Sequence, residues 1–223
     1  MNRHDRRAAA SKVRRTKLDR VTAVHEAGHA VARVLTADAM GFSAEEAVIC
    51  IKMGATAEPH GVSADDRTYL VSAARTDGPR FSAEIDQHAN PEHPERLEQT
   101  LAAAKQAGAD IHAWLEANSL FTVFASVAEA KFLGVPSLDV WLSPGSEDDR
   151  STLDLNARLA GLDDDATEVL KTRTLARAAE LVERPDVWRA VLAVADNLPT
   201  RGRIEGAEIA RIVAEAIAEP IGG

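Results

Sequence analysis

The chain contains a single cysteine, Cys50, among its 223 residues. An intrachain disulfide is therefore excluded, and any metal site must draw its ligands from histidine, aspartate and glutamate. Aromatic residues make up only 4% of the sequence, whereas hydrophobic residues make up 45% and alanine is frequent. This composition favours close-packed helices over a sheet-rich sandwich, because strands are enriched in aromatic residues.

Long apolar runs are missing as well. No window reaches the roughly 18 uncharged apolar residues of a membrane-spanning helix, and no such run follows the charged N-terminus as it would in a secretory signal. We therefore expect a cytoplasmic protein without a transmembrane anchor. The phosphate-binding pattern Gly-x-x-x-x-Gly-Lys-Ser/Thr is also missing, which predicts a protein that does not use ATP.

The formal net charge of -9 is unevenly distributed. Residues 1–20 carry eight arginines and lysines against two aspartates, a local charge of +6. We interpret residues 1–17 as a basic, flexible N-terminal arm and residues 18–223 as the folded domain. Such an arm can bind nucleic acid, an anionic membrane or an acidic partner, but it is more often only a solvated terminus.

The apolar spacing predicts a mainly helical protein. Residues 18–39 are predicted as a buried helix, residues 47–53 as the one convincing strand, and residues 65–75 as the start of another helix. Proline and polar residues favour a loop or insertion over 77–94. Helical spacing then recurs in six segments: 95–107, 110–133, 147–161, 165–183, 186–197 and 205–218. The expected fold is mainly α with a small β-sheet (α+β), ending in a C-terminal helical bundle.

The predicted first helix contains His25-Glu26-Ala27-Gly28-His29, which matches the HExxH pattern. Residues four apart share one face of a helix, so both imidazoles can bind one zinc ion. Glu26 can then act as the general base for a zinc-activated water that attacks a peptide carbonyl. Alternatively, these are core histidines or exposed helix residues that match a short pattern by chance, but the flanking apolar residues supply the dry surroundings of a metal site.

Gly28 is informative in its own right. Glycine costs about 1 kcal/mol relative to alanine in the middle of a helix. We therefore expect Gly28 to mark a close approach of another backbone.

A catalytic zinc usually takes three protein ligands, so one more is required. Two groups of candidates are present. Four of the histidines outside the motif are candidates, and they lie in or near less regular segments: His60, His88, His93 and His112. The acidic cluster Glu147, Asp148 and Asp149 follows a Pro-Gly turn and Ser146, which can cap a helix. The cluster can equally serve capping alone, and spacing leaves Asp148, Asp149 and Asp154 open as ligands.

Several segments, in order, resemble the peptidase domain of the FtsH-type membrane AAA proteases, over roughly residues 18–218. HEAGHAVARVL is similar to the zinc helix of that family, and EEAVICIKMGATAEPHGVSADDRT to the strand and glycine-containing segment that follow it. SVAEAKFLG resembles the helix with an Ala-Glu pair, here Ala128-Glu129. GSEDDRSTLDLNARLAG resembles the segment whose aspartate is the third zinc ligand, and LVERPDVWRAVLAVADNLPTRGRIEGAEIARIV the closing helices.

The resemblance implies an FtsH peptidase-like fold with a zincin-like HExxH helix and zinc as cofactor. Its ligands would be His25, His29 and Asp149, because matching Gly145 and Ser146 to the motif places the aspartate at 149. Glu26 would be the catalytic base. Glu129 would lie beside the ligands rather than on the metal.

We therefore expect a stand-alone, ATP-independent zinc metalloendopeptidase that hydrolyses flexible or unfolded polypeptide. One alternative is a metal-binding but catalytically silent interaction module. Another is a regulatory protein that uses the basic arm on nucleic acid. The intact Glu26 favours the peptidase over the silent module, and oligomerisation is compatible with the sequence.

Overall fold

The computed structural model describes residues 20–40, 43–55, 66–72, 98–99, 102–103, 105–106, 110–201 and 203–219. The predicted basic arm at 1–17 and the predicted loop at 77–94 lie outside these residues.

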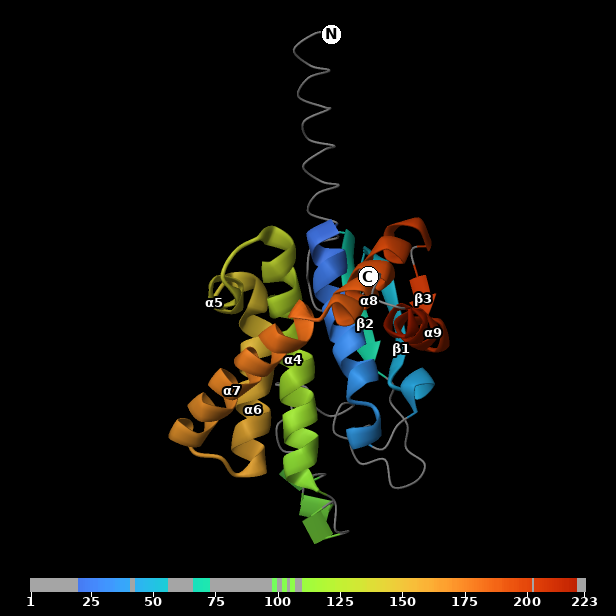
Figure 1. The fold of residues 1–223 in the computed structure, drawn as a ribbon. Helices are drawn as coiled ribbons and strands as arrows, with labels where there is room; N and C mark the ends of the chain where they lie inside the picture. The colour runs from blue at the N-terminus through green and yellow to red at the C-terminus, as the bar shows by residue number, and fades with distance from the viewer. Residues whose placement is uncertain are drawn as a thin grey trace.

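The first described element is a helix over residues 20–35, here called the HExxH helix, which is blue in Figure 1. Two short 3-10 helices follow it, η1 (Asp38–Met40) and η2 (Ala44–Glu46). A small antiparallel sheet has the strand order β2-β1-β3. Its strands are β1 (Val48–Ala55), β2 (Asp66–Ser72) and β3 (Arg203–Glu205).

Apart from β3 and short connections, the described chain from residue 111 onward is helical. Its helices are α4 (Ile111–Leu133), α5 (Ser137–Trp141), the 3-10 turn η3 (Pro144–Ser146), α6 (Glu147–Ala160), α7 (Asp164–Glu183), α8 (Pro185–Arg201) and α9 (Gly206–Ala218). The predicted mainly α architecture with a small sheet is therefore confirmed.

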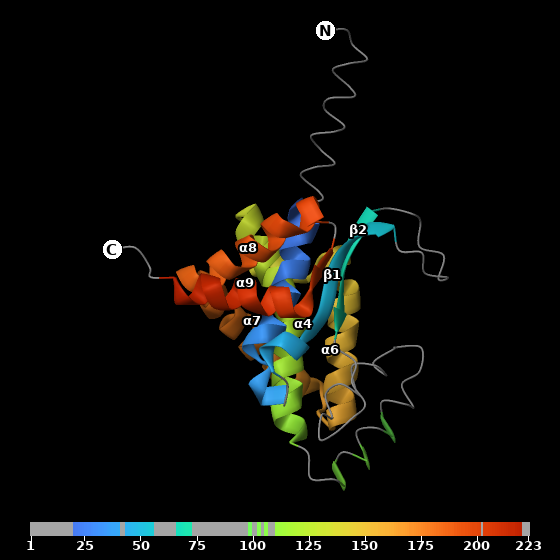
Figure 2. The same cartoon turned by 90° about the vertical axis from the view of Figure 1, so that its right-hand side faces the viewer.

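Helix α4 lies at the centre of the molecule. It packs against α5, α6 and α7, and the HExxH helix lies beside it (Figure 1). Because neighbours cover it on several sides, most of its residues are buried and it shows no single apolar stripe. Helices α8 and α9 pack on each other and contact β1 next to the HExxH helix (Figure 2). One continuous hydrophobic core joins all these layers.

The helix ends agree with the breaks in the sequence. Helix α4 ends at Gly134 and α6 at Gly161, both in the left-handed region with φ of 69° and 95°. Glycine adopts this conformation without the steric cost that a Cβ would add. The Asp110 and Asp163 side chains accept hydrogen bonds from the first turns of α4 and α7.

One prediction about local structure needs correction. The helix expected to start within 65–75 is wrong, because this segment forms β2, in which Leu70 pairs with Ile51 of β1. Residues such as Tyr69 and Val71 fit a paired strand better than a helix. The apolar spacing predicts neither the strand β3 nor the helix α5, because these elements are only three and five residues long and too short to show a period.

None of the helices within the described ranges combines the length and the apolar character that crossing a membrane requires.

Candidate metal site

The HExxH helix approaches α4 closely at Gly28. A Cβ placed on Gly28 would lie 2.8 Å from Ala125 Cα and 3.2 Å from Ala128 Cβ. The first distance is shorter than a Cβ contact can be and the second is unusually tight, so only glycine fits here without a shift of α4. The predicted close approach of another backbone is confirmed, and it places the two histidines beside α4.

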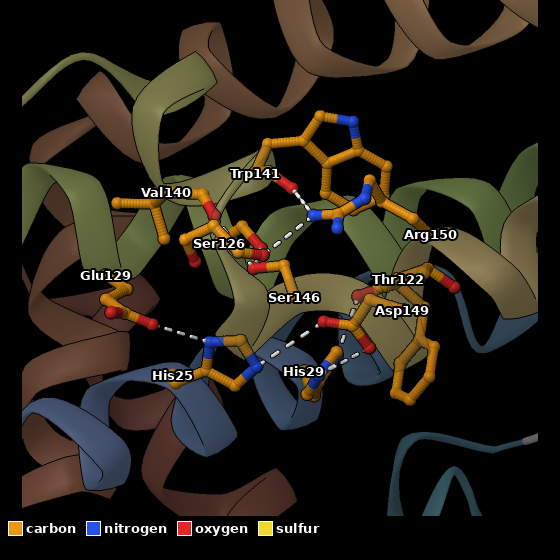
Figure 3. Close-up of polar contacts among 12 residues, drawn as sticks. His25, His29, Thr122, Ser126, Glu129, Val140, Trp141, Ser146, Asp149 and Arg150 are labelled. Carbon is orange, nitrogen blue, oxygen red and sulfur yellow. Dashed lines mark hydrogen bonds and ion pairs between the residues drawn. The ribbon is translucent and has the colours of Figure 1, made fainter.

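His25, His29 and Asp149 converge at this contact (Figure 3). His25 Nε2 lies 3.5 Å from Asp149 Oδ2, and His29 Nε2 lies 3.5 Å from Asp149 Oδ1. One donor atom from each residue falls within 4.8 Å of the other two. The three ligands implied by the family resemblance are thus brought together from the HExxH helix and the first turn of α6.

Each histidine has its other ring nitrogen held by an acceptor. His25 Nδ1 donates to Glu129 Oε2 at 2.9 Å, and His29 Nδ1 donates to the carbonyl oxygen of Phe121 at 2.9 Å. With a proton on each Nδ1, the Nε2 atoms that face Asp149 are the ring atoms available to bind a metal. Histidines that bind metals are usually held in this way by a carboxylate or a backbone carbonyl.

The donor set fits a metal ion. Two imidazole nitrogens and a carboxylate oxygen are ligands that zinc prefers, and three protein ligands leave a fourth position for water. Asp149 Oδ2 is buried and has no hydrogen-bond partner among the described residues. A buried carboxylate oxygen without a hydrogen bond is costly, and a positive charge compensates for it, either a proton on His25 or a metal ion between Asp149 and the two Nε2 atoms.

The electrostatics of the site require positive charge near Asp149. Burial disfavours the charged form of His25, but interactions with Asp149 and Glu129 outweigh it and raise the pKa of His25 to about 10. Burial dominates at His29 and lowers its pKa to about 4. Burial opposes ionisation of Asp149 as well, yet the two histidines hold its pKa below the ordinary value. One positive charge, either a proton on His25 or a metal ion, therefore balances the carboxylate.

Asp149 is positioned by hydrogen bonds around the start of α6. The Ser146 hydroxyl, expected to cap this helix, makes no capping hydrogen bond; it donates to Val140 O at 3.0 Å and lies 2.8 Å from Ser126 Oγ. Arg150 donates to the carbonyl oxygens of Trp141 and Ser143. The start of α6 is thus joined to α4, to the end of α5 and to the turn that follows α5, which directs Asp149 towards the histidines (Figure 3).

Glu26 is half-buried and lies close enough to His25 for its charge to help raise the pKa of that histidine. Asp148 is exposed and does not belong to the cluster. Asp154 is half-exposed and forms an ion pair with Lys171, at 2.7 Å. Of the candidate ligands considered from the acidic segment, Asp149 alone joins the two histidines among the described residues.

Of the remaining histidine candidates, the structure describes only His112. His112 is exposed in the first turn of α4 and is not part of the cluster. His60, His88 and His93 lie outside the described residues.

Sequence reasoning missed the part played by Phe121. Its carbonyl oxygen holds His29, and any residue type can supply a backbone carbonyl. Its ring also packs against His29, with the ring centres 4.7 Å apart. An aromatic residue inside a buried helix gives no signal that distinguishes this role from ordinary core packing.

Comparison with known proteins adds no family: no family model matches the chain, and no curated protein has a significantly similar sequence. The residues and their geometry define the class of site, a candidate HExxH metal centre with an aspartate as third ligand.

Proposed function

We propose that this chain is a zinc-dependent metalloendopeptidase that hydrolyses flexible or unfolded polypeptide without ATP. The observation that carries the proposal is the convergence of His25, His29 and Asp149, with both Nδ1 atoms already engaged by acceptors. The HExxH motif also contains Glu26, which would serve as the general base for hydrolysis. The resemblance to FtsH-type peptidase domains supports this function and an FtsH peptidase-like fold.

Zinc bound by these residues would lower the pKa of a water to about 7 and polarise the scissile carbonyl. Glu26 would accept the proton of that water during attack and return it to the leaving amine. Glu129 and the Phe121 carbonyl keep the Nδ1 protons in place, so both Nε2 atoms stay available as ligands. The Asp149 carboxylate would partly neutralise the dication.

The proposed substrate is restricted to accessible chain. The sequence has no phosphate-binding loop, so the proposal includes no ATP-driven unfolding step. A loop or an unfolded segment can enter a site of this kind without prior unfolding. Unfolded casein is therefore a suitable probe.

The test compares casein hydrolysis and zinc content for the wild type and Glu26→Gln. We expect the variant to keep its zinc and to lose at least about 100-fold in rate, because general-base catalysis contributes about 10²–10⁴-fold. Glu180→Gln, which changes an exposed glutamate on α7, is the matched control and should hydrolyse casein as the wild type does.

Equal proteolysis by the wild type and Glu26→Gln would reject Glu26 as the base. A wild type that binds zinc but hydrolyses no accessible polypeptide would favour the silent interaction module instead.

A further inference from the structure

Arg33 is a buried cation close to the metal site. It lies on the HExxH helix one turn beyond His29, and only 2% of it is exposed. Burying a charge is costly unless specific interactions compensate for it. Arg33 Nη1 donates to Asn118 Oδ1 at 3.2 Å, and the guanidinium lies 4.1 Å from the centre of the Phe121 ring.

Both of these partners belong to α4 and are held there. Asn118 Nδ2 donates to the carbonyl oxygen of Trp114 at 3.2 Å, which leaves Oδ1 to face Arg33. Phe121 contacts His29 twice, through its ring and through its carbonyl oxygen. The contacts therefore run from Arg33 to Phe121 and from Phe121 to His29.

We infer that Arg33 is a positioning residue for the metal site, which acts by holding Phe121 against His29. The inference rests on the proposed function, since it needs His29 to be a zinc ligand. Arginine suits this place because its flat guanidinium stacks on an aromatic ring and donates a hydrogen bond at the same time. Lysine keeps the charge, but its compact ammonium group lacks the planar surface that stacks on the ring and the fixed arrangement of donors.

The test is a double-mutant cycle on zinc affinity, measured by competition with a chelator. The variants are Arg33→Lys, Phe121→Leu and the double variant; leucine removes the ring and keeps the backbone carbonyl. Each single change should weaken zinc binding about tenfold, the lower end for groups that orient metal ligands. The double variant should also lose about tenfold, because both changes break the same contact.

Arg173→Lys is the matched control, since it changes an arginine with a largely exposed side chain that is paired with Glu116, and it should leave zinc affinity unchanged. Thermal unfolding of each metal-free variant separates folding from positioning. A merely structural Arg33 would lower the melting temperature without changing zinc affinity.

Unchanged zinc affinity in Arg33→Lys, or additive losses of about 100-fold in the double variant, would overturn the inference while leaving the proposed function intact. If Arg33→Lys does not fold, the uncharged Arg33→Gln replaces it in the cycle, because a neutral group is easier to bury. A wild type that binds no zinc would overturn the proposed function and this inference together.

Discussion

The HExxH helix and the first turn of α6 supply the two halves of the candidate metal site, and they are held in different ways. The HExxH helix is packed into the core by apolar side chains, with Val24, Ala27 and Val31 fully buried. The first turn of α6 is acidic and partly exposed. Hydrogen bonds of Ser146 and Arg150 hold it, rather than apolar packing.

This difference shows how the site is specified. His25 and His29 lie on the same face because they are four residues apart on one helix. A short sequence pattern is therefore enough to predict their arrangement. The direction of Asp149 depends on contacts between elements far apart in the chain. We call His25 and His29 the local half of the site, because one helix sets their spacing, and Asp149 the tertiary half, because contacts between distant elements place it. Substitutions in the two halves should therefore affect stability and zinc binding differently.

Removing the carboxylate of Asp149 should have the largest effect. We expect Asp149→Ala to abolish hydrolysis and to weaken zinc binding by more than about 100-fold, the upper range for groups that only support a ligand. Asp148→Ala, one residue away and exposed, should change zinc binding much less. Zinc content of both purified variants checks this, and a full zinc equivalent in Asp149→Ala would show that another residue completes the site.

The next effect concerns Glu129, which accepts the Nδ1 proton of His25. Glu129→Gln keeps an acceptor but removes the charge, so zinc affinity should fall about tenfold. Glu147→Gln, an exposed change in the first turn of α6, serves as the control. Chelator competition gives both affinities, and equal values would mean that Glu129 does not support His25.

Gly28→Ala tests the close packing of the HExxH helix, the local half of the site, against α4. The added methyl meets the α4 backbone at Ala125, and overpacking of this kind costs about 1–3 kcal/mol, partly offset by the better helix propensity of alanine. Gly145→Ala is the control, because a Cβ there meets only Ser143 Oγ at 3.6 Å. Denaturant unfolding measures both, and equal stabilities would show that the helices separate at little cost.

Ser146→Ala tests the tertiary half and should have the smallest effect. It removes a buried hydroxyl and leaves the Val140 carbonyl without that donor, at a cost of about 1–2 kcal/mol. We also expect a severalfold loss of zinc affinity, since α6 would be held less firmly. Ser151→Ala, an exposed change on the same helix, should alter neither quantity. If Ser146→Ala lowers stability without changing zinc affinity, Ser146 does not help to orient Asp149.

Much of the helical architecture could be predicted because long periodic segments carry a strong signal. The prediction for α4 agrees with its observed bounds to within one residue, whereas the HExxH helix ends at residue 35, four residues before its predicted end. Gly28 correctly predicts the close approach of these two helices. Strand β2 could not be predicted, because a short mixed segment has no clear period and its structure depends on its pairing with β1.

The site divides in the same way. His25, Glu26 and His29 could be identified from spacing, whereas spacing left Asp148, Asp149 and Asp154 equivalent. A family resemblance selected Asp149, and the structure brings that residue to the histidines. The parts played by Phe121 and Arg33 depend on a backbone carbonyl and a buried stack, which only the packed structure reveals.

X-ray absorption at the zinc edge of the wild-type protein tests the central claim most directly. The account predicts one bound zinc with two imidazole nitrogens at about 2.0–2.1 Å and a carboxylate oxygen at about 2.0–2.2 Å, without sulfur. A sulfur ligand at about 2.3 Å, or fewer than two imidazoles, would contradict it.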